Sequence, residues 1–166
     1  MPEVRIEINS ALAEDTPIIC DTEQKTARDI FLLQSGKPIE TFALIGNKIG
    51  TSHIMNIPQE LYANSLCEII LVNGFHFKCT PATKILMYNQ GYKSVKDIVD
   101  GDKVTVLRYT HDGPGGVDAV DIKSHDIETS ALKKPVYIFV TEHGNLFIPY
   151  TPKDKENTIE FVVVKQ

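Results

Sequence analysis

The sequence is short of the features that nucleic-acid-binding and membrane proteins need. It has 17 lysine and arginine residues against 22 aspartate and glutamate residues, a formal net charge of -5. An acidic chain without a basic face is not expected to bind nucleic acid or an anionic membrane. No apolar run approaches the roughly 18 residues of a membrane span, and the polar start MPEVRIEINS is unlike a secretory signal. We therefore expect no nucleic acid, no membrane and no export by a signal peptide.

Cysteine is also scarce. Cys20, Cys67 and Cys79 are far apart, form no CxxC pair and have apolar neighbours. This pattern favours buried, reduced thiols. A zinc site joining Cys79 to His53 or His76 is the alternative, although its spacing matches no familiar ligand pattern. We expect no metal and no cofactor.

The residues that are present favour an all-β domain. A length of 166 residues suits one domain. Short apolar runs with turn signals about every 8–12 residues predict roughly ten short strands. The clearest hairpin is CEIILVNGFHFKC at residues 67–79, in which Asn73-Gly74 joins two apolar runs and alternation turns His76 toward solvent.

Helices and loops form the smaller part of the prediction. We expect two or three short helices, at residues 23–36, in a helical or turn segment at residues 57–64, and at residues 94–102. The glycine-rich segment 111–118 is predicted to be a loop. The strongly β-prone end, residues 159–166, would invite a partner strand if it were left unpaired.

Several segments share their order with one family. The stretch from Asn73 to Val106 combines a hairpin arm, a Thr-Pro turn, a strand, a glycine turn, a short helix and a strand after Gly-Asp. The segment ALAEDTPI, residues 11–18, and the late strands at residues 122–149 and 159–166 complete the series. Together they resemble the Hint domain, the all-β fold shared by inteins and hedgehog autoprocessing domains. The resemblance implies a Hint/intein-like domain over residues 11–166, with residues 1–10 as an N-terminal arm or flanking strand.

The resemblance also assigns a splicing role to particular positions. An intein begins with a Cys or Ser nucleophile, and here Ala11 stands at that position. A Thr-x-x-His element positions and protonates the scissile amide; Thr80 matches its threonine, but Thr83 stands where the histidine is expected. Some inteins start with alanine, so Ala11 alone does not exclude splicing.

The late positions of the resemblance differ as well. Ile138 replaces the aspartate expected after a Val-Tyr pair. Lys165 and Gln166 replace the terminal His-Asn pair, whose asparagine cyclises to release the downstream segment. Glutamine can cyclise in some inteins, whereas lysine is a poor proton donor at neutral pH.

These substitutions favour a degenerate, splicing-inactive module over an enzyme. We expect it to act by protein binding or structural assembly, for example as a phage virion decoration or accessory protein, in the cytoplasm or on a virion. Its partners would be other protein chains, joined by strand addition at either terminus. The alternative is a mini-intein, natural or engineered, that splices at the Ala11 and Gln166 junctions. A third interpretation, a hydrolase using His125 beside Asp126, or His143, lacks a placed nucleophile.

Overall fold

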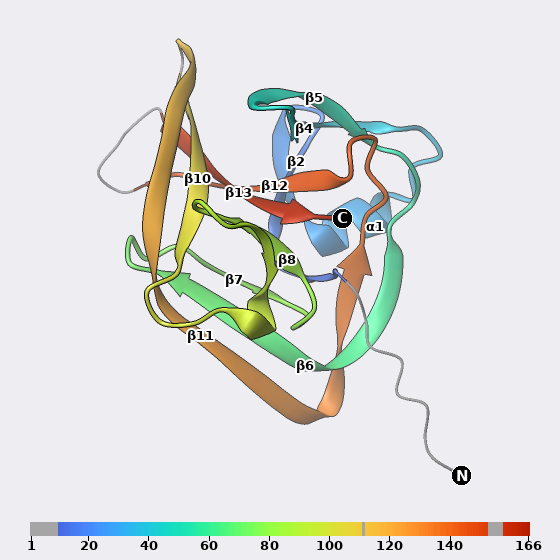
Figure 1. Ribbon diagram of the computed structural model, residues 1–166. Coiled ribbons are helices and arrows are strands. Elements are labelled where there is room, and N and C mark those ends of the chain that lie inside the picture. Colours follow the sequence, from blue (N-terminus) through green and yellow to red (C-terminus); the bar gives the residue numbers. More distant parts are fainter. Residues whose placement is uncertain (1–9, 111, 153–157) are drawn as a thin grey trace.

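The chain folds almost entirely into strands. The computed structural model describes residues 10–110, 112–152 and 158–166, and over these residues it contains 13 strands, one α-helix and one 3-10 helix (Figure 1). The predicted all-β class is therefore confirmed. Within the same residues, no helix has the length and apolar character needed to cross a membrane. The arm predicted at residues 1–10 lies outside the described residues except for Ser10.

The elements follow one another along the chain with short connections. They are β1 (Leu12–Ala13), β2 (Pro17–Cys20), β3 (Glu23–Thr26), α1 (Ala27–Leu33), β4 (Ile39–Ile45), β5 (Lys48–Ile54), β6 (Gln59–Leu71), β7 (His76–Cys79), β8 (Lys84–Met87), β9 (Gly91–Ser94), η1 (Val95–Asp97), β10 (Lys103–Thr110), β11 (Gly113–Ile138), β12 (Asn145–Tyr150) and β13 (Thr158–Lys165).

The long strand β11 joins two halves of one antiparallel sheet. Its first part, up to Asp121, pairs with β10, and from Ile122 onward it pairs with β6. The strand order is β1-β7-β6-β11-β10-β13-β8-β9, with β12 paired to β13 and two separate hairpins, β2–β3 and β4–β5. The short strand β1 pairs with both β7 and β11, so one half of the sheet closes on itself around β1.

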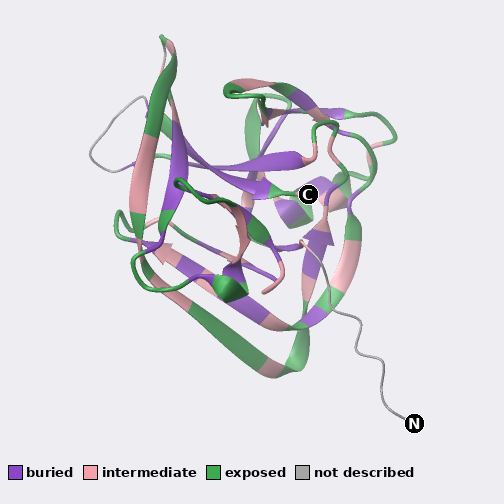
Figure 2. Ribbon diagram, in the orientation of Figure 1, coloured by how far each residue is buried: buried purple, intermediate pink, exposed green. Residues whose placement is uncertain are grey.

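The core lies between these folded-over parts, as the buried interior of Figure 2 shows. Most buried apolar side chains form one cluster that includes Leu12, Ile69 and Val162. A second, smaller cluster around Phe147 and Phe161 lies on the opposite face of β12 and β13. These two strands are therefore buried on both faces, which explains their nearly continuous apolar sequences.

The predicted hairpin at residues 67–79 is present as β6 and β7. The loop has three residues rather than two: the Leu71 N–H donates to the Phe75 carbonyl oxygen, and the Gly74 N–H donates to the Leu71 carbonyl oxygen, both at 2.9 Å. Gly74 has a φ of 92°, the left-handed conformation that closes three-residue hairpin loops. His76 is exposed and Phe77 is buried, as alternation predicts.

The first predicted helix is shorter than expected. Residues 23–26 form β3, which pairs with β2 from Pro17↔Thr26 to Cys20↔Glu23. The helix begins only at Ala27, because the Thr26 side chain accepts a hydrogen bond from the Asp29 N–H at 3.2 Å and caps it. The last predicted helix is a single 3-10 turn, η1.

Two other local predictions are wrong. Residues 57–64 contain no helix; β6 begins at Gln59 and pairs with the far end of β11. Residues 113–118 are strand rather than loop, because β11 begins at Gly113 opposite β10; His111 lies outside the described residues. In both segments, pairing with a distant strand decides the structure over local sequence preference.

The C-terminal strand is not an edge. Residues Thr158–Val162 of β13 pair with β10, residues Glu160–Lys165 pair with β12, and Val164 pairs with Ile85 of β8. Strand addition at this terminus, expected from the sequence, therefore has no free edge to use. The same expectation for the N-terminus falls on residues outside those described.

Asp102 holds together the loop between η1 and β10. Its carboxylate accepts hydrogen bonds from the Gln90 amide at 2.9 Å, the Lys93 ammonium at 2.7 Å and the Val99 N–H at 3.0 Å. These donors favour the ionised form and lower the pKa of Asp102 to about 2, with the Gln90 hydrogen bond as the largest cause. The Gly-Asp pair seen in the sequence thus has a structural role here.

Replacing Asp102 with asparagine is expected to destabilise the fold. The Asp102→Asn variant should lose roughly 1–3 kcal/mol of unfolding free energy at pH 7, because an amide cannot accept all of these hydrogen bonds. Since the folded-state pKa lies below the usual value of 3.8, the stabilisation is present above pH 3.8 and is lost as the pH falls toward 2. Urea unfolding across this range should show a smaller decline for Asp102→Asn. The exposed neighbour Asp100 supplies the control, and an equal effect of Asp100→Asn would contradict this role.

Candidate functional site

Ala11 lies against two threonine hydroxyls. The Ala11 N–H donates to Thr80 Oγ1 at 3.2 Å and to Thr83 Oγ1 at 3.1 Å. The Ala11 carbonyl oxygen accepts from the Thr80 N–H at 2.9 Å, and the two hydroxyls lie 2.9 Å from each other. All three residues are buried. The two threonines therefore satisfy both backbone polar groups of a residue that water cannot reach.

The local fold explains why these residues meet. Strand β1 pairs Leu12 with Cys79, so the start of β1 runs beside the end of β7. The chain then turns at Thr80, where the Thr83 N–H donates to the Thr80 carbonyl oxygen at 3.0 Å. Both side chains of this turn consequently face the Ala11 peptide.

The last residue of the sequence lies beside Ser10. The Gln166 amide nitrogen donates to Ser10 Oγ at 3.4 Å, and Ser10 Oγ in turn donates to the Lys165 carbonyl oxygen. The Gln166 N–H donates to the Gly144 carbonyl oxygen at 2.9 Å, and Gln166 Oε1 accepts from the Phe139 N–H at 3.3 Å. Two positions separated by 156 residues in sequence are thus in contact.

The other two predicted positions are Ile138 and Lys165. Ile138 packs against the small buried cluster of Ala11, Ala63, Leu66 and Val136. The Lys165 ammonium lies 5.8 Å from the centroid of the Tyr92 ring, a cation–π contact. The structure therefore brings Ala11, Thr80, Thr83 and Ile138 together, and it places the backbone of Lys165 and the side chain of Gln166 at Ser10.

Solved structures with the same arrangement of strands are inteins and an intein-like domain. A DnaB intein from Synechocystis sp. PCC 6803 is 13% identical over 95% of this chain and 99% of its own, with a TM-score of 0.67. A bacterial intein-like domain from Clostridium thermocellum is 14% identical over 96% and 100% of the two chains, with a TM-score of 0.68. The TvoVMA intein is 15% identical over 94% and 97%, with a TM-score of 0.71.

This chain has the intein fold. The coverage extends over nearly the whole of each chain, so the likeness concerns the complete domain. The TM-scores establish the fold, whereas identities of 13–15% leave the activity to the residues of the site. No protein-family model matches the chain, and no curated protein matches it.

Within this intein fold, the side chain of Ala11 is not a nucleophile. The Ala11 side chain is a methyl group. The nearby Cys79 thiol hydrogen-bonds with Thr83, but burial raises its pKa far above neutral pH. Burial likewise raises the pKa of Cys67 to about 11. A protonated thiol is a weak nucleophile, and the cysteines are free and buried, as the sequence predicted.

Other candidate sites from the sequence are not assembled. His125 faces Asp100 at 3.7 Å, not Asp126, and His143 faces Glu142 at 3.0 Å. The proposed zinc partners of Cys79 are partly or largely exposed, whereas Cys79 itself is fully buried. Among the described residues, no three His, Cys, Asp or Glu side chains gather as a metal site would require.

The aspartates near the glycine-rich segment are engaged in ion pairs. Asp118 pairs with Arg108, and Asp121 lies 3.8 Å from Lys103. Both carboxylates therefore connect β10 with β11, which agrees with the paired structure of this segment.

Some contacts of the site could not be found from the sequence. Ser10, Phe139 and Gly144 carry no distinguishing motif, and each meets Gln166 only because the sheet brings distant segments together. The Tyr137 hydroxyl donates to Glu60 at 2.7 Å, and burial with this hydrogen bond raises the Tyr137 pKa. That bond links β11, on which Ile138 also lies, to Glu60 of β6.

The Thr83 hydroxyl is expected to stabilise the fold. The Thr83→Val variant keeps the shape but removes a partner of the Ala11 N–H, so its unfolding free energy should fall by roughly 1–2 kcal/mol. Urea unfolding measures this change. Thr41→Val is the matched control, because the buried Thr41 hydroxyl has no hydrogen-bond partner among the described residues, and no loss is expected. Equal losses in the two variants would contradict a specific role for Thr83.

Proposed function

We propose that this chain is a splicing-inactive intein-fold module that acts by binding other protein chains or in a structural assembly. One observation carries the proposal: hydroxyl groups of Thr80 and Thr83 surround the Ala11 peptide where the chemistry of splicing would need a nucleophile and an imidazole. Without a Cys or Ser side chain at Ala11, the upstream peptide bond cannot shift onto this residue. Without an imidazole, the scissile amide has no proton donor suited to neutral pH.

The downstream end supports the same proposal. The Lys165 ammonium lies 5.8 Å from the centroid of the Tyr92 ring, and lysine is a poor proton donor at neutral pH in the place of a penultimate histidine. The Gln166 amide is held by Ser10, the Phe139 N–H and the Lys165 carbonyl oxygen. These contacts stabilise the chain end in a fixed arrangement.

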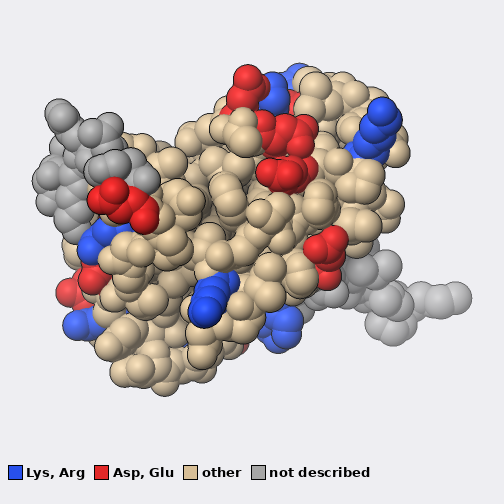
Figure 3. All heavy atoms as spheres, turned by 90° about the horizontal axis from the view of Figure 1, so that it is seen from above, with Lys and Arg blue, Asp and Glu red and all other residues tan. Residues whose placement is uncertain are grey.

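A binding role is supported by exposed apolar side chains on two hairpins. The β10–β11 and β4–β5 hairpins project at the same end of the molecule (Figure 1). They carry the exposed side chains of Ile45, Tyr109 and Val117. The face viewed from this end has few charged side chains across its middle (Figure 3). Sparse charge and exposed apolar groups suit a protein partner, and attachment to a larger particle such as a phage virion is the setting we propose.

Splicing at the Ala11 and Gln166 junctions is the alternative. The contact between Ser10 and Gln166 favours it, because the flanking segments of a splicing domain have to lie close together. This contact is equally useful to a module inserted in, or attached to, another protein. An assay for cleavage and ligation of peptide bonds at Ala11 and Gln166 separates the two possibilities.

Peptides of different mass joined to both ends of the chain test the proposal. After incubation at neutral pH, mass spectrometry should show only the intact fusion, because the first nucleophile and the imidazole are absent. A ligated peptide product, or specific cleavage before Ala11 or after Gln166, would refute the inactive assignment.

A restored variant serves as the control for this assay. It combines Ala11→Cys, Thr83→His, Ile138→Asp, Lys165→His and Gln166→Asn, with a cysteine placed first in the downstream peptide. Cleavage or ligation by this variant would show that the scaffold still positions both junctions and that the missing side chains cause the inactivity. Thermal unfolding of both proteins checks that the substitutions leave the domain folded.

A further inference from the structure

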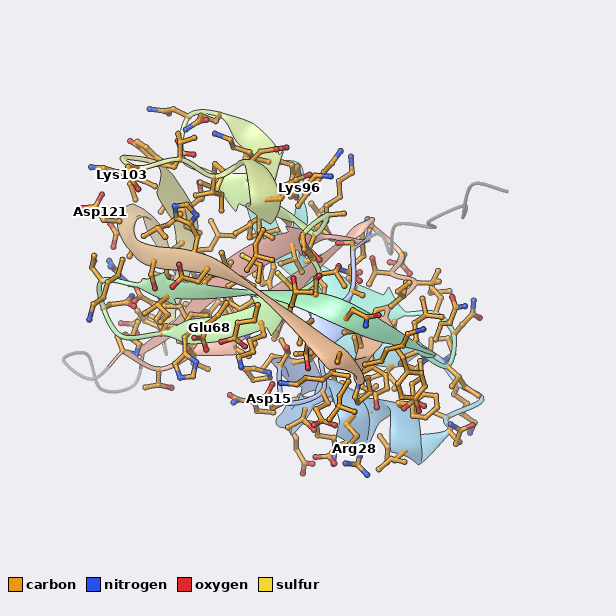
Figure 4. The ribbon with its side chains drawn as sticks, turned by 90° about the horizontal axis from the view of Figure 1, so that it is seen from below. Asp15, Arg28, Glu68, Lys96, Lys103 and Asp121 are labelled. Atoms are coloured by element: carbon orange, nitrogen blue, oxygen red, sulfur yellow. The ribbon has the colours of Figure 1, made fainter. Side chains whose placement is uncertain are left out.

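The middle of β11 has a partner strand on one side only. Its last pair with β10 is Lys103↔Asp121 and its first pair with β1 is Ala13↔Val136; between them, within the described part of the chain, it pairs with β6 alone. Figure 4 shows Lys103 beside Asp121, where β10 leaves β11, and in Figure 1 the one-sided stretch runs along the lower margin of the molecule. A strand edge of this kind presents N–H and C=O groups that can pair with another chain.

The backbone groups of His125 and Ile127 point out of this edge. The Leu71 N–H donates across the β6–β7 hairpin at 2.9 Å, so the peptide groups of Leu71, and by alternation those of Ile69 and Cys67, face β7. His125 lies opposite Ile69 and Ile127 lies opposite Cys67, so their N–H and C=O groups point away from β6. Among the residues that the structure describes, no strand or loop pairs with these groups.

A cleft opens along the same edge. It has a volume of about 510 Å³ and lies between residues 99–101, which precede β10, and residues 122–126 of β11. The chain turns before β10, because the Asp102 N–H donates to the Val99 carbonyl oxygen at 3.1 Å, and it therefore does not continue along β11. The volume falls in the range of roughly 300–1,000 Å³ that is typical of ligand sites. The cleft shares no residue with the Ala11 site.

One face of the edge is apolar. Directly opposed residues share a face of the sheet, so Ile127 points to the same side as Cys67, which belongs to the main buried cluster. Nevertheless Ile127 is 50% exposed, and Val99 on the opposite wall of the cleft is 58% exposed. The apolar surface on this side is thus left uncovered.

The other face of the edge is acidic. Asp126 lies directly opposite Glu68, a pair of like charges that is unfavourable between neighbouring strands. Glu68 has His76 at 3.7 Å, whereas Asp126 makes no ion pair with any described residue. A positive charge on an added strand would complement Asp126.

We propose that an extended segment of a partner protein binds here as an added strand on β11. Its backbone would pair with His125 and Ile127, its apolar side chains would contact Ile127 and Val99, and a lysine or arginine between them would lie opposite Asp126. In this mode of recognition, main-chain hydrogen bonds supply affinity and alternate side chains supply specificity. The inference rests on the proposed binding function and gives the partner a chemistry. It also places strand addition at an internal edge instead of a chain terminus.

Amide hydrogen exchange of the full-length, ¹⁵N-labelled chain tests this proposal. In the free chain, the N–H groups of His125 and Ile127 should exchange faster than those of Ser124 and Asp126, which face β6. The probe is the peptide acetyl-Thr-Thr-Val-Lys-Val-Thr-Thr-amide. It should slow exchange at His125 and Ile127 saturably, in proportion to the bound fraction, and leave Ser124 and Asp126 unchanged.

Two control peptides separate the contributions of backbone and charge. The same peptide with both valines N-methylated cannot donate the hydrogen bonds of an added strand, and it should not bind. A peptide with glutamate in place of the lysine should bind more weakly, because its charge repels Asp126.

Variants of the chain locate the edge. Ile127→Pro removes the outward N–H at a position where an edge strand tolerates proline, and it should abolish binding; Ile127→Ala, which keeps that N–H, should bind within a few-fold of the wild type. Asp126→Asn should weaken the lysine peptide about two- to fivefold, as expected for an exposed charge pair. Asp15→Asn, a carboxylate outside the cleft, should bind like the wild type. Thermal unfolding checks that each variant is folded.

Three results would overturn the proposal: no slowing of exchange at His125 and Ile127, equal slowing by the N-methylated peptide, or wild-type affinity in a folded Ile127→Pro chain. Protection of His125 and Ile127 that appears in the free chain only at high concentration would identify a second copy as the occupant and would also overturn it. None of these outcomes involves cleavage or ligation of peptide bonds. A negative result would leave the splicing-inactive assignment standing, and a spliced product in the mass-spectrometric assay would refute that assignment without altering the exchange result.

Discussion

The structure around β1 depends on the hydrogen bonds of the buried Ala11 peptide. Strand β1 closes half of the sheet by pairing with both β7 and β11, so the residue just before it is inside the protein. Its N–H and carbonyl groups must find partners there. Thr80 and Thr83 provide them, and the same turn carries the chain from β7 into β8. The sheet can therefore close only if the N–H and carbonyl groups of the Ala11 peptide find hydrogen-bond partners.

The contacts that hold the Ala11 peptide in place differ from those that the chemistry of splicing would need. Threonine hydroxyls can hold the Ala11 backbone without activating its neighbouring bond, and the Ala11 methyl group and Ile138 can pack where polar side chains would otherwise stand. The contact of Ser10 with Gln166 likewise holds the residue before Ala11 beside Gln166 whether or not a bond is ever broken. A fold of this kind is therefore retained by packing and hydrogen bonding alone. The proposed binding role rests on the surface of the domain.

The sequence predicted those parts of the fold that depend on local signals. The hairpin around Asn73-Gly74 needs a residue that tolerates left-handed backbone, which Gly74 supplies, and the hairpin is present. Residues 57–64 and 113–118 were mispredicted because strands far away in sequence pair with them. The family resemblance grouped Ala11 with Thr80 and Thr83, which are in contact, although no local pattern predicts that Ser10 and Gly144 meet Gln166. The one-sided edge of β11 is invisible in the sequence, since it depends on where β10 and β1 pair with that strand.

The central claim is that the residues around Ala11 hold the chain and do not cut it. The most direct measurement is the intact mass of the wild-type chain with flanking peptides, followed over time with hydroxylamine present to cleave any ester or thioester that forms. The account predicts a single, unchanged mass. A new species whose mass corresponds to a break immediately before Ala11 or after Gln166 would contradict it.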